Sequence, residues 1–228
     1  MSMKLQLCGP ASALALALAI SASPAQAASS QQNLVDKAVT TINDLRHDNE
    51  FGNAKDLMHR ARAVMVVPGL VKAGFFLGGE GGDAVLMTRT VGGGWSDPAF
   101  YTLASASFGL QAGVEEAEVV MFVMSDRALQ AFMNDEFKIG AQGGLAIATL
   151  GSEAEAATSS NLNADIIVWS SASGAYAGVT LNGSIIKPQD SNNAAYYGHP
   201  VRPADIVVRD SVHNPNDGSL RQALAEAP

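Results

Sequence analysis

The sequence predicts an α+β protein built on a strongly curved, largely antiparallel sheet, barrel-like or sandwich-like, with an N-terminal amphipathic helix and short helices between strands. Two observations favour this class. Short apolar runs rich in β-branched residues alternate with glycine-rich segments across residues 63–186, as strands and turns do. The stretch 92–113, GGGWSDPAFYTLASASFGLQAG, combines glycines and aromatic residues with a single charge, Asp97, a pattern typical of tightly curved strands.

The first 27 residues predict a secretory signal peptide. Lys4 precedes a short apolar run, residues 11–20, and then Ala25-Gln26-Ala27 offers a small-residue cleavage site. The run is shorter than the about 20 apolar residues that a membrane-spanning helix needs. We therefore expect cleavage near Ala27 and a periplasmic or secreted protein.

Composition narrows the class of partner. The formal net charge is −8, and an acidic chain is a poor general binder of nucleic acid. The one cysteine, Cys8, lies inside the predicted signal peptide, so the remainder cannot form disulfides.

About 200 residues suffice for one domain with a substantial core. We expect a domain over residues 28–198 and a C-terminal tail, 199–228, with a short helix packed on it.

The helical segments follow apolar spacing. Leu34, Ala38, Ile42 and Leu45 recur every three or four residues, which predicts an amphipathic helix over 29–51. Gly52-Asn53 is expected to interrupt it before a second helix ending near residue 62. Ser125 or Asp126 is expected to cap a helix that carries Leu129, Phe132 and Met133 on one face, and a terminal helix is expected from Leu220.

The strands are predicted from apolar runs and turn signals. Residues 63–67 form a buried strand that Pro68-Gly69 ends, and residues 71–91 form a hairpin that turns at GGEGG, 78–82. Further strands are expected at 118–124, within 137–150, at 166–169 and at 176–181, with a polar loop at 151–163. Asn182-Gly183 predicts a turn into residues 184–186, and the tail holds one more apolar run, 206–208.

Motifs that could carry chemistry fail their context tests. Gly79-x-Gly81-x-x-Ala84 fits the dinucleotide fingerprint, but a strand rather than a helix is expected after it. Residues 184–187 spell S-x-x-K without the companion motifs of penicillin-recognising enzymes. The histidines, at 47, 59, 199 and 213, lack the spacing of a zinc site. No catalytic residue, metal site or cofactor is predicted, and the chain is not expected to be an enzyme.

Several motifs occur in a fixed order along the chain. They are 63–86 (AVMVVPGLVKAGFFLGGEGGDAVL), 94–101 (GWSDPAFY), 106–113 (ASFGLQAG), 118–142 (EVVMFVMSDRALQAFMNDEFKIGAQ), 164–186 (ADIIVWSSASGAYAGVTLNGSII) and 192–198 (NNAAYYG). Together they resemble the SYLF lipid-binding domain family over residues 31–198. The resemblance implies a non-enzymatic lipid-binding protein, which with the signal peptide would belong to a bacterial cell envelope.

The resemblance also suggests binding residues. Eukaryotic SYLF proteins bind phosphoinositides through basic residues and an N-terminal amphipathic helix, and some relatives bind actin. Lys72 occupies the family's V-K-A-G position, and Arg60, Arg62 and Arg89 flank the same apolar segment. Cations beside an apolar wall suit a phospholipid or membrane surface bound peripherally. These four residues are the predicted lipid site.

Other interpretations stay open. The four basic residues could instead lie over the edge of the core or pair with neighbouring carboxylates. Trp95, Phe100, Tyr101 and Phe108 could line a lipid cavity, although aromatic residues more often fill cores. The alternative function is a structural or protein-interaction module of the envelope, with a protein partner and no specific lipid. The sequence does not indicate an oligomeric state.

Overall fold

The computed structural model describes residues 24–48, 51–74, 77–108, 113–140, 145–149, 164–171, 181 and 183–226. The helices are α1 (Pro24–His47), α2 (Phe51–Arg60), α3 (Asp126–Phe132), α4 (Asp190–Tyr197) and α5 (Gly218–Glu226), with a π-helical turn η4 (Ala204–Val208) and a 3₁₀ turn η5 (Pro215–Asp217). The strands are β1 (Ala63–Gly74), β2 (Leu77–Thr88), β3 (Ala99–Phe108), β4 (Gly113–Val123), β5 (Phe137–Lys138), β6 (Ile147–Thr149), β7 (Ile166–Ser170) and β8 (Ile185–Pro188).

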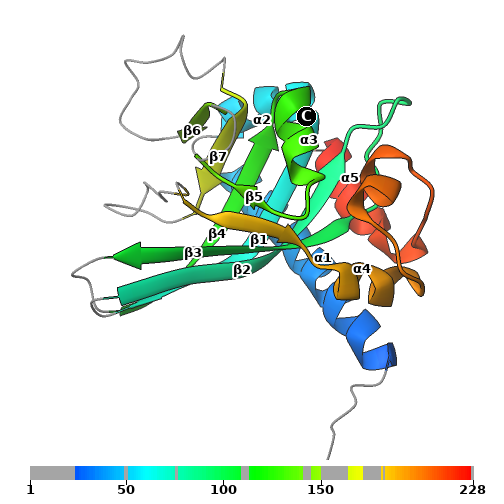
Figure 1. Ribbon diagram of the computed structural model, residues 1–228. Coiled ribbons are helices and arrows are strands. Elements are labelled where there is room, and N and C mark those ends of the chain that lie inside the picture. The colour runs from blue at the N-terminus through cyan, green and yellow to red at the C-terminus, as the bar shows by residue number, and fades with distance from the viewer. Residues whose placement is uncertain are drawn as a thin grey trace, which may run out of the picture.

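Within these ranges the strands form one sheet in the order β5-β8-β3-β2-β1-β4-β7-β6. The pairs are antiparallel apart from β6 and β7, which run parallel. Figure 1 shows that the sheet curls strongly into an open half-barrel, with α1 along one side and α3 across the other. The predicted α+β class with a curved, largely antiparallel sheet is therefore confirmed.

The sheet is buried on both faces at the end where β1 begins. Val64 and Val66 of β1 pack with α1, α2 and α5 in one core cluster, whereas Met65 and Val67 pack with α3 and η4 in a second. We call these sides the α1 face and the α3 face. Because successive strand residues point to opposite faces, a strand that is covered on both sides reads as a continuous apolar run. This explains AVMVV at the start of β1.

The N-terminal helices differ from the prediction in their bounds. The helix predicted over 29–51 ends at His47, and Gly52 and Asn53 lie inside α2 rather than between the helices. The first turn of a helix tolerates such residues, because its first four N–H groups have no partner inside the helix in any case. The predicted signal peptide lies outside the described residues up to position 23, and its last residues belong to the first turn of α1.

The first hairpin also differs. Pro68-Gly69 does not end β1 but falls where the pairing with β2 and β4 shifts register, at a β-bulge. GGEGG lies within β2 instead of forming a turn. A Cβ on Gly82 would meet the carbonyl oxygen of Gly69 at 2.6 Å, so this glycine allows β2 to approach the bulge. The glycine-rich run therefore serves close strand packing rather than chain reversal.

Later elements agree more closely. Ser125 caps α3 as predicted, its side chain accepting a hydrogen bond from the Ala128 backbone N–H. Gly183, at φ 89°, supplies the turn before β8. The predicted terminal helix begins at Gly218, two residues early. The strand predicted at 176–181, apart from Leu181, and the loop at 151–163 lie outside the described residues.

The aromatic residues of the glycine-rich stretch fill the core. Phe100 and Tyr101 are fully buried and Trp95 is 3% exposed. Phe100 meets Tyr196 of α4 edge-to-face at 4.9 Å between ring centroids, and the Tyr101 hydroxyl donates to the Phe132 carbonyl oxygen of α3 at 2.9 Å. These three rings are packing residues, as the core interpretation predicted; the side chain of Phe108 is outside the described set.

Candidate functional site

Three of the predicted lipid-binding residues lie at one end of the sheet. Arg60 is the exposed last residue of α2, and Arg62 follows it just before β1. The backbone N–H of Arg89, after β2, donates to the Arg62 carbonyl oxygen at 2.8 Å. Arg62 also forms an ion pair with Asp126 at 3.2 Å, and both side chains are more than half exposed. The structure thus brings the three arginines together.

Lys72 lies elsewhere. It stands near the far end of β1, with Glu80 of β2 and Glu115 of β4 as its cross-strand neighbours. Ten residues separate it from Arg62 along the chain, roughly 30 Å at the ~3.3 Å rise of a strand. Two acidic neighbours and this separation mean that Lys72 and the arginines do not form a single cationic surface.

Arg89 has a role in packing. Its guanidinium donates to the Met58 carbonyl oxygen at 2.8 Å and to the Gly93 carbonyl oxygen at 3.2 Å, and it lies 4.3 Å from the Trp95 ring centroid. Partial burial lowers the pKa of Arg89 from its ordinary value. The side chain therefore joins the last turn of α2 to the segment after β2 through both of its terminal nitrogens, while its buried Nε has no hydrogen-bond partner among the described residues.

The same end of the sheet also exposes an apolar side chain. Val91 is fully exposed in the turn after Arg89, which two backbone hydrogen bonds of 3.0 Å close between Thr90 and residues 93–94. Lys55 and His59 lie exposed on the outward side of α2, beside Arg60. We name Lys55, Arg60, Arg62 and Val91 the α2 end. A protruding aliphatic residue beside exposed cations is the arrangement that peripheral membrane contact requires.

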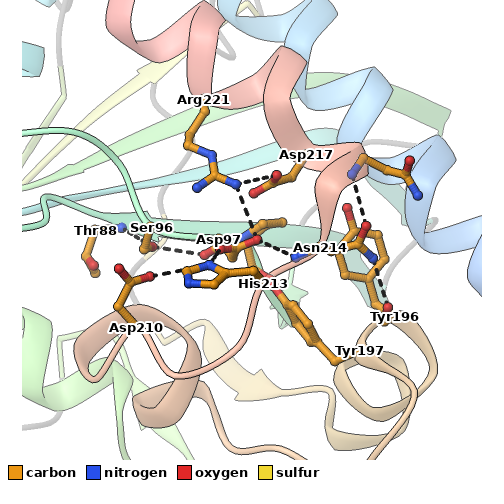
Figure 2. A network of polar contacts seen from close by, with 12 residues as sticks. Thr88, Ser96, Asp97, Tyr196, Tyr197, Asp210, His213, Asn214, Asp217 and Arg221 are labelled. Carbon is orange, nitrogen blue, oxygen red and sulfur yellow. Dashed lines mark hydrogen bonds and ion pairs between the residues drawn. The ribbon is translucent and has the colours of Figure 1, made fainter.

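A second polar site was missed by the sequence analysis. Asp97, between Trp95 and β3, is completely buried. Its Oδ1 accepts a hydrogen bond from the Asn214 backbone N–H at 2.9 Å and lies 3.4 Å from Arg221 of α5. Its Oδ2 lies 2.7 Å from His213 Nδ1. Figure 2 shows Asp97 between Arg221 on one side and His213 on the other. We call Asp97, Asp210, His213, Asp217 and Arg221 the Asp97 cluster.

The cluster contains a second buried carboxylate. Asp217 is fully buried, and Arg221 donates to its Oδ1 at 2.5 Å. Burial raises the pKa of Asp217 most; the Arg221 hydrogen bond opposes this shift and Asp97 adds to it, so the pKa reaches about 6. Two buried carboxylates therefore share one guanidinium.

Two further groups close the cluster on the solvent side. His213 and Asp210 have side chains that are 64% and 46% exposed, and His213 Nδ1 lies 3.9 Å from Asp210 Oδ1. The hydrogen bond to Asp97, followed by the charge of Asp97, raises the pKa of His213. Among the described residues, Asp97, Asp210 and His213 form a group whose ligand-type atoms all lie within 4.8 Å of one another. The histidines lack the spacing of a zinc site in the sequence, yet the fold places His213 beside two carboxylates.

Neighbouring hydrogen bonds hold the cluster in place. Ser96 Oγ accepts from the Thr88 backbone N–H at 3.0 Å and donates to the Asp97 carbonyl oxygen at 2.9 Å. The Tyr197 hydroxyl donates to the Pro98 carbonyl oxygen at 2.7 Å. Two signals could have revealed the site in sequence: a lone charge in an apolar stretch, and carboxylates three before and four after His213. Neither identifies the partners, because 116 residues separate Asp97 from His213.

Comparison with known proteins identifies the family. A family model described as "Ysc84: Las17-binding protein actin regulator" matches residues 104–227. The chain is 27% identical over 187 residues to SH3 domain-containing YSC84-like protein 1 of Homo sapiens, covering 78% of this chain and 55% of that protein. It is 27% identical over 186 residues to the protein of the same name in Rattus norvegicus, with the same coverage.

A yeast protein is also similar. LAS seventeen-binding protein 3 of Saccharomyces cerevisiae is 30% identical over 146 residues, covering 63% of this chain and 32% of that protein. The chain thus spans about half the length of the animal relatives and a third of the yeast one. Within the described residues no helix has the length and apolar character to cross a bilayer. The matched segment runs from the second half of β3 to α5 and includes every member of the Asp97 cluster except Asp97 itself. The chain belongs to the Ysc84 family, whose domain is the SYLF domain.

Proposed function

We propose that the protein is a non-enzymatic phospholipid-binding protein of the cell envelope and that it contacts the membrane peripherally through the α2 end. The observation that carries this proposal is the position of Arg60 and Arg62, exposed beside the protruding Val91. Arginine binds phosphate oxygens in a bidentate manner, and each cation near an anionic membrane surface contributes about 1 kcal/mol. Val91 would enter the headgroup region beside them.

The overall charge makes the position of these cations important. With a formal net charge of −8, the average field of the protein repels an anionic bilayer. Binding must therefore come from a local surface on which cations outnumber carboxylates. Around the α2 end, Lys55, Arg60 and Arg62 are exposed, with Asp56 and Asp126 among them. Lys72, flanked by Glu80 and Glu115, offers less net positive charge.

Vesicle co-sedimentation tests the proposal. The full chain is mixed with vesicles of phosphatidylglycerol and phosphatidylethanolamine and, separately, with neutral phosphatidylcholine vesicles. We expect binding to the anionic vesicles that falls about 30-fold in the double variant Arg60→Ala, Arg62→Ala, since two cations near the surface contribute about 2 kcal/mol. Arg202→Ala, at an exposed arginine of the C-terminal segment, is the matched control and should bind as the parent does.

Three results would overturn the proposal. The first is the absence of binding to either vesicle type at low salt. The second is a double variant that binds anionic vesicles as tightly as the parent. The third is a selective loss in Lys72→Ala, which would move the contact surface to the far end of β1. The envelope location has its own test: the protein should be found in the periplasmic or secreted fraction and begin near Ala28.

A second candidate function rests on the family's description, which names a protein-binding regulator of actin. The chain would then be a structural or protein-interaction module of the envelope. Affinity capture from envelope extract discriminates between the two: a stoichiometric protein partner retained by lipid-free protein, and by the Arg60→Ala, Arg62→Ala variant, favours this alternative.

A further inference from the structure

The Asp97 cluster carries more negative than positive charge and plays no part in the proposed membrane contact. It holds three carboxylates, of Asp97, Asp210 and Asp217, against the single guanidinium of Arg221 and one imidazole. Two of the carboxylates are fully buried. A buried carboxylate is costly unless it is paired, so the surplus charge in this cluster favours a cation.

One buried acceptor of the cluster also lacks a donor. Asp217 Oδ2 is buried and has no hydrogen-bond partner among the described residues, while Oδ1 is held by Arg221. Figure 2 shows the Asp217 carboxylate over the Asp97 carboxylate, with the imidazole of His213 beyond it. The cluster thus contains acceptor capacity that its own donors leave unfilled.

We propose that Asp97, Asp210 and His213 bind a divalent transition-metal cation such as Zn²⁺, with Arg221, which Asp217 binds in turn, holding Asp97 in place. One imidazole nitrogen and two carboxylate oxygens are a donor set that Zn²⁺ and Mn²⁺ accept. Ca²⁺ prefers six to eight oxygen ligands and does not suit a site with an imidazole. Three protein ligands would leave further coordination positions for water.

The geometry is close to what such an ion needs. Ligand atoms at about 2.1 Å from a tetrahedral metal lie roughly 3.4 Å apart. Here His213 Nδ1 is 2.7 Å from Asp97 Oδ2 and 3.9 Å from Asp210 Oδ1. His213 and Asp210 are the exposed members, so rotation of their side chains can equalise these distances while buried Asp97 stays fixed.

Arg221 does not block the site. Its guanidinium contacts Asp97 Oδ1 and Asp217 Oδ1, whereas the metal would take Asp97 Oδ2 on the side of His213. Arg221 and the Asn214 backbone N–H hold Oδ1 and so orient Oδ2 toward the imidazole. Groups that orient a coordinating carboxylate in this way sharpen metal affinity. On binding, the metal would replace the hydrogen bond between His213 Nδ1 and Asp97.

The test uses the full chain, stripped with a chelator and dialysed. Isothermal titration with Zn²⁺ and Mn²⁺ should give one site per chain, and Co²⁺ should produce ligand-field absorption bands when it occupies the site. Because a ligand stabilises the state that binds it, Zn²⁺ at 100 times its Kd should raise the Tm by roughly 5–10 °C. Calcium is the comparison ion and should bind more weakly.

Variants locate the site. His213→Ala and Asp210→Asn alter exposed side chains and should fold, and each should weaken Zn²⁺ binding at least 10-fold. His199→Ala is the matched control, an exposed histidine on another part of the surface, and should bind as the parent does. The proposal is overturned if neither Zn²⁺ nor Mn²⁺ binds, or if His213→Ala retains full affinity. Preference for Ca²⁺, unaffected by His213→Ala, would also contradict it.

Discussion

The glycines of β2 allow a matched pair of substitutions. A Cβ on Gly82 would lie 2.6 Å from the Gly69 carbonyl oxygen and 2.9 Å from Val67 Cγ1, both at the β1 bulge. A Cβ on Gly81, one residue earlier in the same strand, would lie 3.5 Å from the Leu103 carbonyl oxygen, an ordinary contact. The two positions share chemistry and strand but differ in the space available.

The expected effects have opposite signs. The 2.6 Å contact is with backbone, which cannot rotate away, so Gly82→Ala forces β1 and β2 apart; such overpacking costs about 1–3 kcal/mol. Alanine also restricts the unfolded chain, which returns about 0.4–1 kcal/mol. The net loss is therefore about 1–2 kcal/mol for Gly82→Ala, whereas Gly81→Ala should gain about 0.4–1 kcal/mol. At about 2–4 °C per kcal/mol, the Tm should fall by roughly 2–8 °C in the first variant and rise by roughly 1–4 °C in the second.

Calorimetry and urea unfolding of the two full-length variants provide the measurement. A Gly82→Ala protein as stable as the parent would refute the close approach of β2 to the bulge. Equal effects of the two alanines would refute it as well, because an exposed turn at GGEGG would not distinguish these neighbours.

Two further predictions concern polar contacts. Arg89→Ala should lower the free energy of unfolding by about 2–3 kcal/mol in urea titrations, because it removes two charged hydrogen bonds and the contact with Trp95. Arg60→Ala, the control at an exposed arginine, should change it by less than about 0.5 kcal/mol. Equal losses in the two variants would contradict the packing role of Arg89. Burial would raise the pKa of Asp165, but hydrogen bonds from Ser125, the Ala146 N–H and Arg127 lower it below the ordinary value. Its stabilising contribution is therefore present above about pH 4 and is lost as the pH falls through the lowered folded-state pKa. Asp165→Asn should reduce stability by about 2 kcal/mol at pH 7 and by progressively less in acid, and a pH-independent difference between the two proteins would contradict this assignment.

Local sequence signals correctly predicted the elements that are determined by residues close to one another in the chain. Ser125 caps α3 by accepting a hydrogen bond from the backbone N–H three residues further on. Gly183 adopts a left-handed backbone conformation, which glycine reaches readily because it has no side chain. Apolar runs likewise indicated β4 and β7. Errors arose where a local signal competes with tertiary packing: GGEGG reads as a turn in isolation, and only the bulge opposite Gly82 explains its place in a strand.

The candidate sites show the same contrast between features that a local signal predicts and features that depend on tertiary contacts. The sequence shows that the basic residues flank one apolar segment. In the structure this segment forms β1, which separates Lys72 from the arginines along its length, and composition does not reveal that a segment is an extended strand. Asp97 was visible as a lone charge, yet its partners lie on the last segment of the chain. A buried polar cluster assembled from distant segments leaves no periodic pattern, because each segment contributes only one or two residues to it.

The distance in sequence between Asp97 and Arg221, 124 residues, has a consequence for biosynthesis. The same closing segment meets the N-terminal helix, where Arg46 donates to the Ala223 carbonyl oxygen. During synthesis, Asp97 therefore lacks the guanidinium of Arg221, and α1 lacks α5, until residues 218–226 have been added. The core cluster on the α1 face is therefore incomplete until Leu220 and Leu224 are present. Truncation before Gly218 would remove α5 and leave buried Asp97 without the guanidinium of Arg221.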